Sequence, residues 1–258
     1  MKTIDLNADV GESFGAWRMG DDAAVIASVT SANIACGFHA GDAATMRRTV
    51  ALAQEHGVAI GAHPSLPDLA GFGRREMTVS PDEVYGFMLV QIGALHGIAT
   101  AAGARLHHVK PHGALYNMAA RDRALADAVA RAVRDFDHRL VLVGLAGGAS
   151  LEAGRAAGLR VAAEAFCDRR YRADGSLAPR GEPAAVIEDV DAAIAQAVDI
   201  AVCGQATAID GSRVAIHADT LCVHGDGPHA AELARGLRAA LESAGIAAVA
   251  PHADRDGR

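Results

Sequence analysis

Aromatic residues and basic residues are both scarce in this chain. Aromatics make up 4% of its 258 residues, and 24 Lys and Arg stand against 31 Asp and Glu, which gives a net charge of −7. No run of basic residues occurs, and aromatic residues do not alternate with basic ones. A nucleic-acid surface needs such features. The sequence therefore predicts a protein with no nucleic-acid partner.

Long apolar runs are also absent from the sequence. We find no run of about 18 apolar residues, so no membrane-spanning segment and no membrane partner are expected. Residues Met1–Asp5 lead directly into a polar strand, without the apolar region of a secretory signal peptide. The cytoplasm is the expected location.

Cysteine and glycine motifs are missing too. The four cysteines form no C-x-x-C pair, so we expect neither a structural zinc site nor disulfides. Cys36 and Cys222 lie in apolar strands and are predicted core residues, whereas Cys167 lies in a polar stretch that could border a site. No nucleotide-binding glycine motif occurs, and the glycines of residues 144–148 are interpreted as a tight turn. A nucleotide site within this chain is therefore not expected.

What the chain does contain is an alternation of short apolar strands with helical segments. Apolar residues make up 51% of it, enough for a large core. Repeated strand–helix units without a polar linker predict an α/β fold with one parallel-stranded domain over residues 1–252, followed by a frayed tail at 253–258. The predicted strands are Ile4–Ala8, Ser31–Cys36, Val58–Ala62, Leu106–Lys110, Leu140–Val143, Val161–Ala165, Leu221–His224 and, more weakly, Ala247–Ala250.

Helix boundaries are also marked in the sequence. Ser80 is an expected N-cap, with proline at the first helical position and Glu83 completing a capping box, and this helix should end near Gly103. Asp42 should cap another helix. A further helix is predicted from Asp226 to about Gly245.

Polar residues gather where the predicted strands end. Four histidines stand where a strand gives way to a Gly- or Pro-rich turn, and they are His39, His63, His112 and His224. An acidic cluster opens the chain over residues 5–12 in the same way. The carboxyl ends of parallel strands converge on one mouth in a β/α barrel, where catalytic groups collect. We therefore predict one active site at a barrel mouth.

The first strand is predicted to point its acids inward. By the two-residue period of a strand, Asp5, Asn7 and Asp9 share one face, while apolar residues share the other. Buried carboxylates need partners, which Lys110 and the histidines of neighbouring strands could supply. The alternative is an edge strand with a solvated polar face.

Lys110 and His112 share a face by the same period. A lysine near the mouth could bind a carboxylate or stabilise an oxyanion. Asp9, His39 and His63 complete the predicted catalytic set with them. Each histidine taken alone would more often be structural.

A second polar segment follows the sixth predicted strand. Glu164 and Asp168 alternate along its extension, and Arg169 comes next, although a surface charge run would give the same pattern. With Asn7 and His224, these residues are predicted to bind substrate. The loop of residues 71–75 either folds over the mouth or is a plain connection.

Several segments, in order over nearly the whole chain, resemble the LamB/YcsF family of 5-oxoprolinase A subunits. Leu66 is a small departure, since many relatives carry an aromatic residue there. The matching segments are DLNADVGE (5–12), ANIACGFHAGD (32–42), GAHPSLPDLAGFGRR (61–75), VKPHGALYN (109–117), EAFCDRRY (164–171) and CVHGD (222–226).

This resemblance implies an irregular seven-stranded barrel similar to the glycoside hydrolase/deacetylase type. It also implies ATP-dependent opening of 5-oxo-L-proline, a lactam, to L-glutamate in a complex with subunits B and C. ATP would then be used at the level of the complex, in keeping with the absence of a phosphate loop here.

The mechanism is left with three alternatives. In the first, Asp9 or a histidine is the general base, another histidine protonates the ring nitrogen, and Lys110 and Arg169 hold anionic oxygens. In the second, Asp9, His39 and His63 bind a divalent metal in a deacetylase-like hydrolase. In the third, the chain only binds and delivers the lactam.

Overall fold

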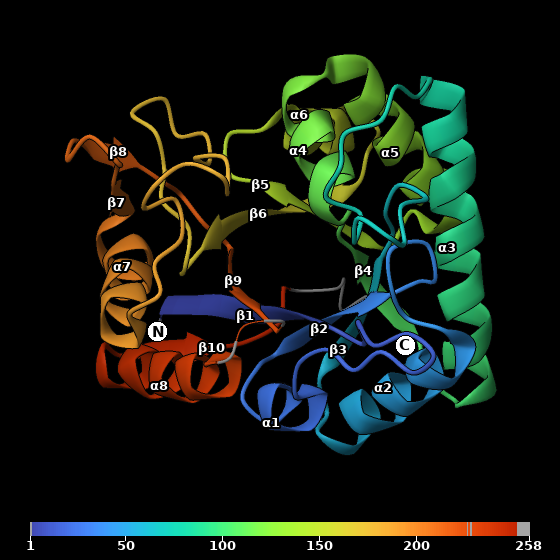
Figure 1. Cartoon of the computed structure of the whole chain (residues 1–258), viewed down its shortest axis with the longest axis horizontal. Coiled ribbons are helices and arrows are strands. Elements are labelled where there is room, and N and C mark those ends of the chain that lie inside the picture. Colours follow the sequence, from blue (N-terminus) through green and yellow to red (C-terminus); the bar gives the residue numbers. More distant parts are fainter. Residues whose placement is uncertain (1, 226, 228, 252–258) are drawn as a thin grey trace.

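Parallel strands form a closed barrel surrounded by helices in the computed structural model (Figure 1), which describes residues 2–225, 227 and 229–251. The strands are β1 (Lys2–Val10), β2 (Ser31–Ala35), β3 (Ala59–His63), β4 (Leu106–Val109), β5 (Val141–Leu145), β6 (Arg160–Phe166), β7 (Gln205–Thr207), β8 (Arg213–Ala215), β9 (Thr220–His224) and β10 (Ile246–Ala248).

The barrel is closed by a pairing between its first and last strands. Strands β1 to β6 lie side by side in chain order, β9 follows β6, and β9 also pairs with β1. These seven pairings are all parallel. The predicted seven-stranded parallel barrel is therefore confirmed. The weak eighth strand exists as β10, which pairs with the start of β1 outside the closed ring.

The segment between β6 and β9 contains a feature that the sequence analysis missed. Strands β7 and β8 form an antiparallel hairpin, and each is only three residues long. Such short strands carry no readable alternation, which explains the omission.

Helices surround the strands, with α7 and α8 on one side in Figure 1 and α3 and α5 on the opposite side. They are α1 (Asp22–Ile26), α2 (Ala43–Glu55), α3 (Pro81–Ala101), α4 (Gly113–Arg121), α5 (Arg123–Asp137), α6 (Ala149–Ala156), α7 (Val190–Cys203) and α8 (Ala230–Ser243).

The predicted helix caps are present. The Asp42 carboxylate accepts a hydrogen bond from the Thr45 amide at 2.7 Å. Ser80 and Glu83 form the full capping box at the start of α3. Asp226, where the last helix was predicted to begin, and the predicted tail lie outside the described residues. Ala230 is the first residue of α8.

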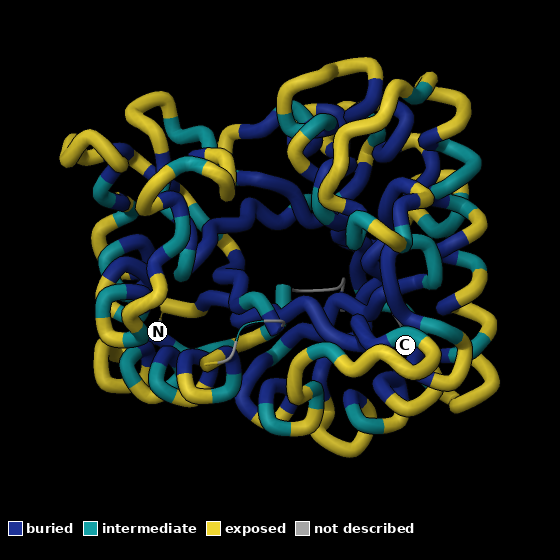
Figure 2. Tube along the Cα trace, in the orientation of Figure 1, coloured by how far each residue is buried: buried dark blue, intermediate teal, exposed yellow. Residues whose placement is uncertain are grey.

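The outer faces of the strands make the core between barrel and helices. In β1, Leu6 and Ala8 are fully buried and Ile4 is 4% exposed, as the two-residue alternation predicts. Figure 2 shows the strands of the closed barrel mostly buried, while the helices and the β7–β8 hairpin carry exposed positions. The core is therefore a ring around the barrel, which leaves the barrel interior for polar side chains.

One expectation about apolar segments needs correction. Among the described residues, α3 is by length and composition apolar enough to cross a membrane. In this fold, however, it packs its buried face, which includes Met88 and Leu95, against β3, β4 and α5. Part of its apolar surface is therefore used in packing against α5 and the barrel strands.

Candidate active site

Polar side chains of β1 point into the barrel. Asp5 and Asn7 are each 2% exposed and Asp9 is 5% exposed. Because β1 pairs with β2 on one side and β9 on the other, it is not an edge strand along this stretch. The alternative of a solvated polar face is therefore wrong.

Below the mouth, these side chains form a hydrogen-bonded set that crosses the barrel. The Asp5 carboxylate accepts from Ser31 Oγ at 2.7 Å and Thr220 Oγ1 at 2.5 Å. The Asn7 amide donates to Glu164 Oε1 at 3.0 Å. Burial raises the pKa of Asp5 to about 6, although the hydroxyl donors oppose this shift. We call this set the interior network, and its members are Asp5, Asn7, Ser31, Glu164 and Thr220.

Lys110 joins the interior network to the mouth. Its Nζ lies 2.8 Å from Asp9 Oδ1, 2.8 Å from Glu164 Oε1 and 3.1 Å from Cys222 Sγ. Burial disfavours the ammonium ion, but the neighbouring anionic groups, Asp9 first, outweigh this and hold the pKa of Lys110 well above its ordinary value. The lysine is therefore a fixed positive charge, and it is 2% exposed.

Three histidines and a glutamate meet beside Asp9. We call Glu12, His39, His63 and His112 the histidine cluster; one possible ligand atom from each lies within 4.8 Å of the others. His63 Nε2 lies 2.9 Å from His112 Nδ1, and His39 stacks on His112 with ring centroids 3.8 Å apart. Glu12 Oε1 lies 3.5 Å from His39 Nε2.

Burial keeps two of these imidazoles neutral. It is the largest cause that lowers the pKa of His39 and of His112 well below the ordinary value. The opposite applies to Asp9, where burial alone would raise the pKa but His63 and Lys110 hold it well below its usual range. His39 and His112 are therefore neutral rings near an ionised carboxylate.

The loop of residues 71–75 folds over this cluster, which settles the question left open by the sequence. The Phe72 carbonyl lies 2.9 Å from His112 Nε2, and the Gly73 carbonyl accepts from the Ala114 amide at 2.8 Å. Gly73 has a φ of +64°, and a Cβ there would lie 2.8 Å from His112 Cδ2. Only glycine lets the loop approach this closely.

On the far side of the mouth, β9 ends in a histidine–carboxylate pair. His224 Nδ1 lies 2.8 Å from Asp168 Oδ2, and the His224 ring stacks on Phe166. Burial would raise the pKa of Asp168, but His224 outweighs it and lowers that pKa. With 12% of its side chain exposed, His224 is accessible from the cavity.

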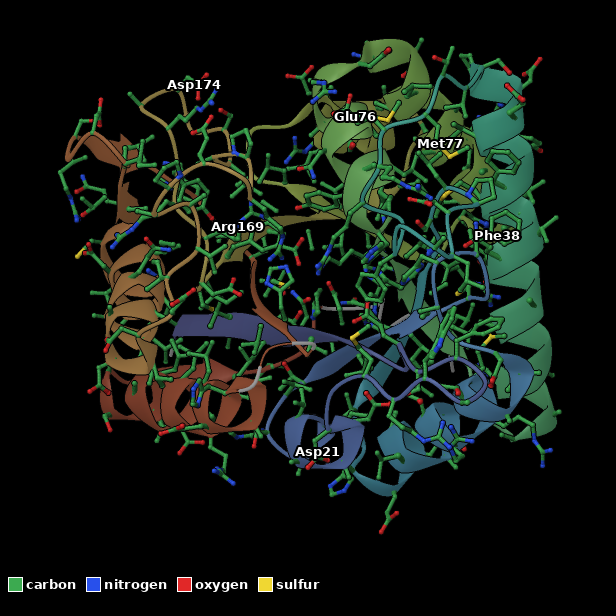
Figure 3. All side chains as sticks on the ribbon, in the orientation of Figure 1. Asp21, Phe38, Glu76, Met77, Arg169 and Asp174 are labelled. Atoms are coloured by element: carbon green, nitrogen blue, oxygen red, sulfur yellow. The ribbon has the colours of Figure 1, made fainter. Side chains whose placement is uncertain are left out.

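Arginines surround the outer part of the mouth. Arg169 Nη2 donates to the Ala178 carbonyl at 2.6 Å, and burial lowers its pKa to about 10. Figure 3 places Arg169 over the strands, well inside Asp174 and Glu76, which lie nearer the edge of the molecule. Arg74 and Arg180 also line the opening.

These groups line a cavity of about 750 Å³, a volume typical of small-molecule sites. Its wall combines a buried polar floor with an arginine-rich entrance. The lining residues that carry ionisable or aromatic groups include Asp9, His63, Arg74, Lys110, His112, Tyr116, Phe166, Arg169, Arg180 and His224.

The structure brings all ten predicted site residues to this end of the barrel, at different depths. Six of them line the cavity, and they are Asp9, His63, Lys110, His112, Arg169 and His224. The other four sit behind these: His39 stacks on His112, Asp168 holds His224, and Asn7 and Glu164 bind Lys110 from below.

Two sequence expectations change in detail. Cys167 is fully buried in the core and does not border the cavity among the described residues. The expected metal set of Asp9, His39 and His63 is divided, since the two histidines group with Glu12 and His112, while Asp9 groups with Cys222 and His224.

Three participants were missed by sequence reasoning. Glu12 lies in the opening acidic segment, yet no role was given to it. Asn33 Nδ2 donates to Asp9 Oδ1 at 2.9 Å, and its Oδ1 lies 2.8 Å from His108 Nε2. A signal existed for His108, because it is two residues before Lys110 and therefore shares its face. A Cβ on Gly61 would lie 2.0 Å from that imidazole, so β3 needs glycine there.

Comparison with known proteins finds a family match over nearly the whole chain. The LamB/YcsF family profile matches residues 4–255. The 5-oxoprolinase A subunit of Bordetella pertussis is 63% identical over 244 residues, which are 95% of this chain and 97% of that protein. The 5-oxoprolinase A subunit of Geobacillus kaustophilus is 57% identical over 251 residues, or 97% and 98% of the two chains.

One solved structure is closely similar to this chain in both fold and sequence. The lactam utilization protein from Thermus thermophilus superposes with a TM-score of 0.91 and is 52% identical. The match covers 97% of this chain and 100% of that one. Sequence and fold similarity therefore extend over the same length.

Proposed function

The chain belongs to the LamB/YcsF family, and from this premise we propose that it is the A subunit of an ATP-dependent 5-oxoprolinase. It would open 5-oxo-L-proline to L-glutamate together with subunits B and C, in the cytoplasm and without nucleic-acid or membrane partners. The observation that carries the proposal is the 63% identity with a protein of that name over 95% of the chain.

The chemistry of a lactam explains why ATP is needed. A five-membered lactam is a stable planar amide, so water attacks it only after the carbonyl is activated. Transfer of the γ-phosphoryl group of ATP to the amide oxygen would activate it. The chain has no phosphate-loop motif. We therefore assign this transfer to the complex and hydrolysis of the activated lactam to this chain.

The cavity offers groups for each part of that hydrolysis. Arg169, with the arginines at the entrance, would bind the carboxylate or phosphoryl oxygens, and Lys110 would stabilise negative charge deeper in the site. A base from the catalytic set Asp9, His39, His63 and His112 would take a proton from water. Neutral imidazoles suit this role better than Asp9, whose lowered pKa makes it a weak base.

Proton and bond changes balance in this scheme. A first water oxygen bonds to the carbonyl carbon and gives up its proton to the base, and the ring C–N bond breaks as the nitrogen gains a proton from an imidazolium. This leaves an acyl phosphate, and a second water then breaks the acyl-phosphate bond to release L-glutamate and phosphate. His224, held by Asp168, lies at the cavity wall where it can supply the proton for the ring nitrogen. A histidine oriented by a carboxylate is a common proton-transfer arrangement.

A second candidate is a subunit that binds the lactam and delivers it to its partners without chemistry. The arginines at the entrance favour this alternative, because they would bind an anion whether or not it reacts there. A deacetylase-like hydrolase has the weaker support of the barrel type alone.

An ATP-dependent glutamate-release assay tests the proposal, first on this chain alone and then with subunits B and C. We expect release only from the complex. In that complex Asp9→Asn should lower turnover roughly 10²–10⁴-fold while lactam binding persists, because Asp9 positions both Lys110 and His63. The exposed His56→Gln is the matched control.

Each alternative predicts a different result in the same assay. A protein that only delivers the lactam would lose affinity in Asp9→Asn and keep the turnover of bound substrate. A deacetylase-like enzyme would act on acetylated sugars without ATP. Near-normal turnover by a folded complex that carries both Asp9→Asn and His63→Ala would contradict the proposed roles.

A further inference from the structure

Backbone carbonyls fix the tautomers of two rings in the histidine cluster. His63 Nδ1 lies 2.7 Å from the Lys110 carbonyl oxygen, and His112 Nε2 lies 2.9 Å from the Phe72 carbonyl oxygen. A carbonyl oxygen only accepts, so each of these nitrogens must carry the hydrogen. In a neutral imidazole the other nitrogen then carries a lone pair.

The two lone-pair nitrogens face each other. His63 Nε2 and His112 Nδ1 are 2.9 Å apart, which is the distance of a hydrogen bond, and His63 Nε2 also lies 3.3 Å from Asp9 Oδ2. When both rings carry a single hydrogen, neither has one to place between these two nitrogens. Two acceptors at this distance repel. The arrangement is stable only with a positive charge at this point, either an added proton or a metal cation.

His39 adds a second, independent observation. The residue is 1% exposed, yet among the described residues neither of its ring nitrogens makes a hydrogen bond. Burial of polar atoms without hydrogen-bond partners costs free energy. Its Nε2 lies 3.5 Å from Glu12 Oε1, on the same side as the facing pair. A ligand for this nitrogen would remove the cost.

We propose that the histidine cluster binds one divalent transition-metal ion, with zinc the best match to its donors. Three imidazole nitrogens and one carboxylate oxygen form a typical zinc ligand set. Ligand atoms about 2.0–2.1 Å from a tetrahedral zinc lie about 3.3 Å from each other. The three separations of 2.9, 3.5 and 3.7 Å bracket that value. The stacked His39 and His112 rings would have to tilt toward a common point.

The outer contacts of the cluster match those of known metal sites. A histidine that binds metal nearly always donates its other N–H to a carbonyl or carboxylate, which fixes the ring. His63 and His112 both meet this rule through main-chain carbonyls. Phe72, which supplies one carbonyl, has a φ of 55°, unusual for a residue with a side chain. Strain of this kind is typical of functional sites.

A neighbouring group of possible ligands, Asp9, Cys222 and His224, is less suitable. The Lys110 ammonium already lies 2.8 Å from Asp9 Oδ1 and 3.1 Å from Cys222 Sγ. A metal cation there would be repelled by this buried positive charge. The ligand set therefore contains Glu12 in place of the Asp9 expected from sequence.

The site is assigned from ligand geometry and does not depend on the proposed function. Because the four protein ligands fill a tetrahedral site, the bound ion would act as a Lewis acid on a carbonyl or water only by taking a fifth ligand. With three histidines engaged as ligands, proton transfer in the cavity would pass to His224, the imidazole outside the cluster.

The test measures metal binding by the full chain directly. Protein freed of metal with a chelator, and shown to be folded by circular dichroism, is titrated with zinc chloride in a calorimeter. We expect one equivalent per chain. Because loss of even an outer contact weakens metal sites ~10–100-fold, Glu12→Gln and His112→Gln should each weaken binding at least about 100-fold. His56→Gln and Cys222→Ser should bind as the wild type does.

X-ray absorption on the zinc-loaded wild type keeps the test valid if a ligand variant fails to fold. We expect only nitrogen and oxygen neighbours at about 2.0–2.1 Å. A sulfur neighbour would place the ion at Cys222 and overturn the assignment. If the folded apo chain bound no stoichiometric zinc, the assignment would also be overturned. In that case, a doubly protonated His63 ring in the ¹⁵N spectrum of the apo chain would show that a shared proton takes the place of the metal.

Discussion

Two buried polar groups within one barrel satisfy their atoms in opposite ways. In the interior network donors mostly meet acceptors: Ser31 and Thr220 hydroxyls donate to Asp5, and the Asn7 amide donates to Glu164 Oε1. Glu164 Oε2 is the exception among the described members of this network, since it makes no hydrogen bond. In the histidine cluster, by contrast, two ring nitrogens that backbone carbonyls leave as acceptors in singly protonated rings lie 2.9 Å apart. A matched network stabilises the fold by itself. A mismatched one is suited to a ligand that supplies the missing charge.

The two groups also differ in what holds them. Every member of the interior network lies on a barrel strand: Asp5 and Asn7 on β1, Ser31 on β2, Glu164 on β6 and Thr220 on β9. Of the histidine cluster, only His63 lies on a strand, and the others follow strand ends. The interior network is therefore held by strands, whereas the histidine cluster lies mostly on loops, which can adjust when a ligand binds.

Lys110→Met should have the largest effect on stability, because it removes the charge that Asp9 and Glu164 share. The buried carboxylates of Asp9 and Glu164 would be left without their ammonium partner, at a cost of roughly 3–5 kcal/mol in the free energy of unfolding. Urea unfolding measures this cost. Lys2→Met, on an exposed lysine, should change stability by less than about 0.5 kcal/mol.

A second substitution separates charge from packing in that experiment. In the Lys110→Met background, Glu164→Gln should restore part of the lost stability, since it removes one of the two uncompensated carboxylates. A double variant less stable than Lys110→Met would show that Glu164 is not paired with the lysine in solution.

Asp5→Asn probes the interior network through pH. The folded protein holds a proton on Asp5 up to a pKa of about 6, whereas the ordinary pKa of an aspartate is 3.8. Between these values the folded state binds more protons, so the wild type loses stability as pH rises through this window. Relative to Asp5→Asn, the loss should reach roughly 3 kcal/mol between pH 4 and about 7. Urea unfolding at several pH values measures it.

Asp42 is a control for this experiment, because its pKa is shifted in the opposite direction and stability should therefore change with pH in the opposite direction. Backbone amides of Thr45 and Gly15 lower its pKa to about 2. The wild type should therefore gain stability relative to Asp42→Asn as pH rises from about 2 to 4. A flat difference between wild type and Asp5→Asn would show that Asp5 is not the buried acid described above.

Ser31→Ala should have a smaller effect, confined to stability. It removes one buried donor to Asp5 and should cost about 1–3 kcal/mol, with ATP-coupled turnover unchanged in the complex. Ser243→Ala, whose exposed hydroxyl donates to the Ala239 carbonyl, is the control and should change stability by less than about 0.5 kcal/mol. A large loss of turnover in folded Ser31→Ala would contradict the division between the two groups.

Local patterns in the sequence were sufficient to predict most of the fold. The two-residue alternation of β1 placed Asp5, Asn7 and Asp9 on one buried face, and capping residues marked the starts of α2 and α3. Both signals act over a few residues, so neither depends on distant contacts. The hairpin of β7 and β8 was missed because three residues show no period.

The sequence by itself determined that acids and imidazoles occupy strand ends, because alternation and turn residues are local properties of the chain. Closure of β9 onto β1 decided that His224 lies opposite the histidine cluster. Only the tertiary structure brought Glu12 to that cluster and set the tautomers of His63 and His112, because the carbonyls that fix those rings belong to Lys110 and Phe72, 47 and 40 residues away. Residue spacing in the sequence cannot predict contacts between residues so far apart in the chain.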